Sequence, residues 1–84
     1  MEHLERIRHM EALYVLLSAA DPRQVCQDPV LLAARDTLEG YLTGGLWLAD
    51  YTLDEAGLLP PDLPRGVLSQ DGLYDLLRRI DGAK

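Results

Sequence analysis

The chain has 84 residues, of which 48% are hydrophobic and 26% charged. This composition is typical of a globular protein and differs from that of disordered chains, which are poor in apolar residues. The length predicts a single domain over residues 1–84, because two cores would each be too small to fold alone. The formal net charge of −6 argues against direct nucleic-acid binding, which needs a basic patch against the phosphates.

The single cysteine, Cys26, limits how so small a core can be stabilised. It can form no internal disulfide and cannot build a cysteine-based zinc site, which leaves good helix packing or self-association. No apolar run approaches the roughly 18 residues that span a bilayer. The charged start of the chain also lacks the apolar region of a signal peptide. We therefore expect a cytoplasmic protein that does not bind a membrane.

A first helix is expected over residues 4–19. Apolar residues recur there at three- and four-residue steps, which places them on one helical face: Leu4, Ile7, Met10, Tyr14 and Leu17. From residue 12 to 17 the run ALYVLL is apolar on every side, and a helix that is apolar all round is buried all round. Either the rest of the chain wraps this half-helix or a second copy covers it. The second case predicts a homo-oligomer with contacts through Leu13, Val15, Leu16 and Leu17.

A second helix is expected to begin at Pro29. Asp28 suits its N-cap, and proline suits the first helical position because its missing N–H would be unpaired there anyway. Apolar side chains of residues 30–45 then gather in one arc of a helix. A similar Asp-Pro pair at residues 21–22 leaves open whether residues 23–27 form a helical turn of their own. Two helices with so short a connection should pack antiparallel as a hairpin.

Gly44 and Gly45 predict the end of this second helix, because glycine is favoured where the chain turns left-handed after a helix. A short helical piece over residues 46–51 should then bring Trp47 and Tyr51, one turn apart, toward the core. We expect the chain to change direction at the two glycines.

The most particular stretch is residues 57–77, GLLPPDLPRGVLSQDGLYDLL. Its three prolines prevent a regular helix, so Leu58, Leu59 and Leu63 must be held by packing in an ordered loop. Ser69 is expected to cap a last helix, and Gly82 to end it. The buried face of that helix is expected to be Leu73, Leu76, Leu77 and Ile80. The elements together predict an all-α domain: an antiparallel two-helix hairpin, an ordered proline-rich loop and a short C-terminal helix packed across it.

The residues that could form a site lie in and around this loop: Asp50, Asp54, Asp62, Arg65, Ser69 and Tyr74. Arg65 is the only cation near these acids, and a guanidinium matches a carboxylate with two parallel hydrogen bonds. We expect Arg65 to pair with one of the first three acids and to pin the loop to the end of the second helix. A hard-cation site among the acids and an anion site at Arg65 and Gly66 are alternatives, but no calcium-loop spacing or phosphate cradle supports them.

The histidines and the cysteine form no recognisable site. His3 and His9 are six residues apart and cannot share a ligand face on a helix. Cys26 has no nucleophile motif around it, so a buried or half-buried structural thiol is expected. The sequence therefore assigns no catalytic residue, no cofactor and no metal.

The loop and its flanks resemble a known family. Over residues 47–77 the chain is similar to the signature of an uncharacterised bacterial family, domain-of-unknown-function family 4298. The residues that carry the resemblance are Trp47, Asp50, Asp54-Glu55, Pro60, Asp62-Leu63, Arg65-Gly66-Val67-Leu68-Ser69, Asp71 and residues 74–77. The opening LERIRHMEALY is similar to the family's start, whereas residues 21–42 are shorter and more apolar than the family's usual middle. The resemblance implies no enzyme activity.

Three functions follow from different features of the sequence. The leading hypothesis is a non-catalytic interaction or adaptor module that self-associates, with its acidic loop face available to another protein. An alternative is a small enzyme or ligand-binding protein with Arg65, Asp62, Asp50 and Tyr74 around a concave pocket. A second alternative is an acidic decoy of a basic nucleic-acid-binding surface, which requires the acids of the middle segment to form a continuous ridge.

Overall fold

The computed structural model describes residues 2–69 and 71–83, and within them it contains helices and no strand. The elements in chain order are α1 (His3–Ala19), α2 (Pro22–Gln27), α3 (Pro29–Thr43), α4 (Leu46–Glu55), the 3₁₀-helix η1 (Gly66–Leu68) and α5 (Gly72–Asp81). The predicted all-α class is confirmed. No helix among the described residues is long and apolar enough to cross a membrane.

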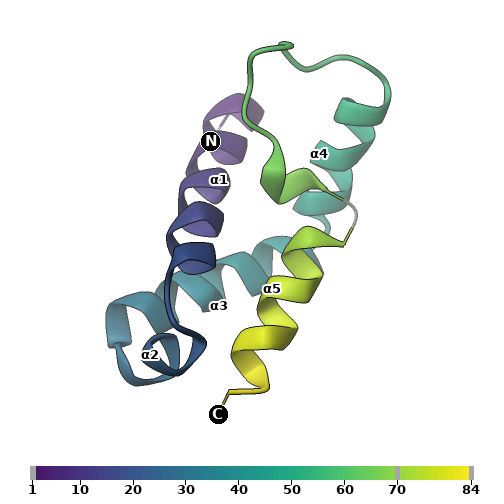
Figure 1. The fold of residues 1–84 in the computed structure, drawn as a ribbon. Coiled ribbons are helices and arrows are strands. Elements are labelled where there is room, and N and C mark those ends of the chain that lie inside the picture. Colours follow the sequence, from purple (N-terminus) through teal and green to yellow (C-terminus); the bar gives the residue numbers. More distant parts are fainter. Residues whose placement is uncertain (1, 70, 84) are drawn as a thin grey trace.

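Acidic side chains cap the first three helices, because a carboxylate can accept the backbone N–H groups that a helix leaves unpaired. Asp21 accepts from Arg23 N, and Asp28 from Val30 N. Asp21 therefore begins a separate helix, α2, which answers the question left open for residues 23–27. This extra helix redirects the chain. Figure 1 shows α3 running across the end of α1, so the two long helices cross instead of lying side by side as a hairpin.

The Gly44–Gly45 corner turns the chain from α3 into α4, as expected. Gly45 has φ +93°, in the left-handed region that glycine tolerates and other residues avoid. The following helix extends to Glu55, four residues beyond the expected piece. From there the loop passes over the top of the molecule in Figure 1 and returns through η1 between α1 and α4.

One apolar core joins the helices and the loop. Leu59 and Leu63 are buried in it, so the irregular chain is held by packing as expected. Leu58 is 67% exposed, and the expectation that it packs inside is wrong. The positive φ of Gly57 lies just before Leu58, where the chain leaves α4, and it is Leu59 that turns inward.

The last helix begins later than expected. Ser69 ends η1, donating its backbone N–H to the carbonyl oxygen of Gly66 at 3.1 Å, and α5 starts at Gly72 with Asp71 in the N-cap position. The N-cap of α5 is therefore Asp71 and not Ser69, which stands at the C-terminal end of the unpredicted 3₁₀ turn. The expected buried face of α5 is confirmed: Leu73, Leu76, Leu77 and Ile80.

The run ALYVLL in α1 is not buried all round. Leu17 is fully buried and Leu13 packs partly against the core, whereas Val15 is 56% and Leu16 46% exposed. Leu17 therefore cannot contribute to a surface for self-association, in contrast to the expectation. The core covers one side of the helix only, because α1 lies at the edge of the molecule (Figure 1).

Candidate functional site

Arg65 closes the loop on itself and on α4. Its guanidinium forms an ion pair with Asp54, and its Nε and Nη2 donate to the carbonyl oxygens of Leu63 at 3.2 Å and Pro60 at 2.5 Å. The expected pairing with one of the nearby acids is thus confirmed, with Asp54 as the partner. It attaches the loop to α4 and not to the end of the second helix, because Asp54 belongs to the part of α4 that the expected helical piece did not include.

The next residues are held from two other helices. Val67 donates its backbone N–H to Glu11 Oε1 of α1 at 2.7 Å, and its carbonyl oxygen accepts from Trp47 Nε1 of α4 at 2.9 Å. Gly66 lies against the same carboxylate: a Cβ there would be 3.2 Å from Glu11 Oε2 and 3.4 Å from the ring of Tyr14. The glycine thus allows α1 to approach η1 closely, and Glu11 and Trp47 fix the two polar backbone groups of Val67.

Asp50 is fully buried and is held by two other helices. Arg6 of α1 donates to it through Nε at 2.9 Å and Nη2 at 2.5 Å, and the hydroxyl of Tyr41 on α3 donates at 2.7 Å. The hydrogen bond to Asp50 raises the pKa of Arg6. Burial, followed by the bond to Asp50, raises the pKa of Tyr41. This buried ion pair connects α1, α3 and α4, and sequence reasoning missed the roles of Arg6 and Tyr41.

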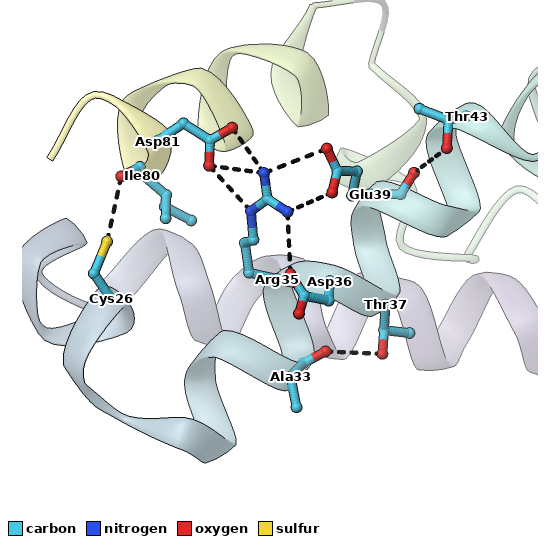
Figure 2. A network of polar contacts seen from close by, with 9 residues as sticks. All are labelled: Cys26, Ala33, Arg35, Asp36, Thr37, Glu39, Thr43, Ile80 and Asp81. Atoms are coloured by element: carbon cyan, nitrogen blue, oxygen red, sulfur yellow. Dashed lines mark hydrogen bonds and ion pairs between the residues drawn. The ribbon is translucent and has the colours of Figure 1, made fainter. Parts of the chain in front are cut away.

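The role of a second buried charge, Arg35 of α3, was also missed. Figure 2 shows its guanidinium between three carboxylates. Nε and Nη2 donate to Asp81 of α5 at 2.7–3.1 Å. Nη1 donates to Asp36 and Glu39 of α3, and Nη2 also donates to Glu39 at 3.3 Å. The bonds to Asp81 are the largest cause of the raised pKa of Arg35. Arg35 thereby ties the end of α5 to α3, and the thiol of Cys26 donates to the Ile80 carbonyl beside it at 3.5 Å.

The remaining predicted site residues lie at the surface. Asp62 and Ser69 are exposed, and Tyr74 is exposed with the guanidinium of Arg78 5.6 Å from its ring centre. The structure therefore brings together Arg65 and Asp54, places Asp50 inside with α1 and α3, and leaves the other three outside. Among residues 2–69 and 71–83 we find no pocket and no group of three or more side chains suited to hold a metal ion.

Comparison with known proteins identifies the family. The model of a domain of unknown function, DUF4298, matches residues 29–82, more than half of the chain. The chain belongs to the DUF4298 family. No curated protein and no solved structure matches it. The matched part of this DUF4298 domain includes Arg65, Val67, Asp50 and Arg35, whereas α1, which supplies Arg6 and Glu11, precedes it.

Proposed function

We propose that this DUF4298 domain is a non-catalytic protein-interaction module that associates with a second copy through the outward face of α1. The observation that supports this proposal is an apolar stripe on the exposed side of the helix: Ala12, Val15, Leu16 and Ala19. These residues have the spacing i, i+3, i+4 and i+7, which places them on one face. We call them the outer stripe. Since the core already covers the opposite side, α1 carries two apolar faces, and the second has no partner within the described chain.

The composition of the outer stripe suits a partner helix. Ala12 and Ala19 are small, so a second helix can approach closely on either side of the two larger residues. Exposed Glu5 and Arg8 lie toward the N-terminal end of the same side and provide a polar rim, which is usual around the apolar centre of an interface. A second copy brings an identical stripe, so a two-fold dimer would bury both at once.

The two alternative functions have less support. A ligand site around the loop would need free polar groups, whereas Arg65 already donates to three acceptors and Asp50 accepts from Arg6 and Tyr41. A nucleic-acid decoy would need a continuous ridge of the middle acids. Asp50 is fully buried and Asp54 is paired with Arg65, so this ridge is interrupted.

The proposal is tested by sedimentation equilibrium of the whole chain at micromolar concentration. We expect the wild type to show a dimer and the Val15→Ser/Leu16→Ser variant to show a folded monomer with an unchanged far-ultraviolet circular dichroism spectrum. Leu48→Ser is the matched control, because Leu48 is an exposed leucine on α4, at 59% against 46% for Leu16. A monomeric wild type, or an equal loss of association in the control, would contradict the proposal.

A further inference from the structure

The Gly44–Gly45 corner divides the chain into two parts that complete each other. We call residues 2–43 the N-terminal half and the described part of residues 46–83 the C-terminal half. The apolar core is one cluster drawn from both halves, with Ile7, Leu17 and Leu38 from the first and Val67, Leu73 and Ile80 from the second. Neither half therefore contains a closed core of its own.

The polar contacts divide in the same way. Asp50 of the C-terminal half takes its hydrogen bonds from Arg6 and Tyr41 of the N-terminal half, and Arg35 of the N-terminal half binds Asp81 of the C-terminal half. The bonds from Val67 N to Glu11 and from Cys26 to Ile80 also join the two halves. Buried Asp50 thus takes these hydrogen bonds from the other half, whereas Arg35 keeps Asp36 and Glu39 of its own half and receives Asp81 from the other. A buried charge that loses its partner is strongly destabilising.

The link between the halves is a two-residue bend. α3 ends at Thr43 and α4 begins at Leu46, with Gly45 in the left-handed conformation and no side-chain cap on α4. If both glycines adopted helical angles, α3 and α4 would continue as one helix over residues 29–55, on the order of 40 Å long. This helix would carry the C-terminal half away from its own N-terminal half.

We propose that two copies of this chain exchange their C-terminal halves at the Gly44–Gly45 corner, and that the two glycines keep the closed single-chain form dominant. In the exchanged dimer each C-terminal half completes the core of the other copy, so the ion pairs of Asp50 and Arg35 form again between chains. Such an exchange of identical elements is a low-cost route to a two-fold dimer. The contacts are the same in both forms, so the corner decides between them.

The two glycines favour the bend for two reasons. Glycine accepts the left-handed angles of residue 45 without strain, and it is a poor residue inside a helix. Alanine at both positions reverses both effects, since it is strained in the bend and is the best helix former. The inference does not depend on the outer stripe of α1, which would associate by a different surface.

The test compares the whole chain with its Gly44→Ala/Gly45→Ala variant, both carrying Val15→Ser/Leu16→Ser so that the outer stripe cannot contribute. We expect the dissociation constant of the dimer in sedimentation equilibrium to fall at least about 100-fold, because four glycines per dimer change. Gly40→Ala is the control. It lies in α3, where an added Cβ meets nothing within 4 Å, so it should leave the constant unchanged.

The exchange itself is detected in a dimer made from isotope-labelled and unlabelled chains. Nuclear Overhauser contacts between the ring of Tyr41 and the β-protons of Asp50 should appear between the two chains. A folded variant that stays monomeric, or a dimer in which these contacts occur only within one chain, would overturn the proposal. If the variant does not fold, the Val15→Ser/Leu16→Ser chain refolded from urea at millimolar concentration should give the same interchain contacts, and refolding without them overturns the proposal equally.

Discussion

The loop over residues 56–69 and the outward face of α1 differ in how their residues are used. The loop is rich in proline, glycine and charged residues, and its polar groups bond within the molecule. Arg65 pairs with Asp54, and the backbone of Val67 bonds to Glu11 and Trp47. The outer stripe of α1 contains common apolar residues, and all four of them are exposed in the described chain. A distinctive sequence segment can therefore serve contacts within the molecule, while an ordinary one leaves an exposed apolar face, the surface that we propose binds a second copy.

The largest expected effect tests the inward-facing contacts. Asp50→Ala removes the buried acceptor of two donors, Arg6 and Tyr41. We expect the free energy of unfolding to fall by about 3–5 kcal/mol, the usual result of leaving one partner of a buried pair uncompensated. Urea unfolding measures this loss. Asp62→Ala is the control, because Asp62 is an exposed acid of the loop. It should change the free energy of unfolding by less than about 0.5 kcal/mol.

A smaller effect is expected from Arg65→Met, which keeps the aliphatic stem but removes the donors to Asp54, Pro60 and Leu63. We expect a loss of about 2 kcal/mol, in the range of hydrogen bonds that involve a charged group. Amide hydrogen exchange should become faster in the loop and stay unchanged in α5. Unaltered exchange together with an unaltered melting temperature would show that Arg65 does not hold the loop.

Glu11→Ala sharpens the comparison within α1, because this residue lies on the inward side of the same helix. Its loss leaves the backbone N–H of Val67 without its acceptor, and we expect about 1–2 kcal/mol of destabilisation. Glu5→Ala, on the exposed side, is the matched control and should have little effect. Equal melting temperatures for the two variants would contradict the assigned contact.

The smallest effect depends on pH. The pKa of Tyr41 is raised, chiefly by burial, so its neutral hydroxyl stabilises the fold fully below the ordinary tyrosine value of about 10. That contribution is lost as the pH rises from there through the value in the folded protein. Tyr41→Phe should cost about 1 kcal/mol near neutral pH. The difference in melting temperature from wild type should shrink above about pH 10; a constant difference would contradict this prediction.

Local signals in the sequence predicted much of this structure. Contacts between residues that are distant in the chain could not be predicted from it. The acidic caps before Pro22 and Pro29 and the pairing of Arg65 depend on neighbours, so they were recognisable. Arg6 and Asp50 are 44 residues apart, and only the packed helices bring them together. A signal did exist: Asp50 and Arg35 each interrupt an apolar stretch, LWLADYTL and LLAARDTL, which suggests a buried charge but does not identify its partner.

Ser69 illustrates a different reason. Serine is a common N-cap residue, but Ser69 stands at the C-terminal end of a 3₁₀ turn, and the N-cap position of α5 falls at Asp71, two residues later. The sequence also did not identify which residues of α1 form the outer stripe. The run ALYVLL is apolar on every side, and nothing in the run itself determines which side the other helices will cover.

The central claim is that α1 and not the loop carries the interaction surface. It is tested most directly by the molecular mass, from light scattering at one concentration, of two surface variants beside wild type. Val15→Ser/Leu16→Ser changes the outer stripe, and Leu58→Ser/Asp62→Ala changes two exposed residues of the loop. We predict a monomer for the first variant and the mass of the wild-type dimer for the second. A monomer for the loop variant with a dimer for the α1 variant would contradict the claim.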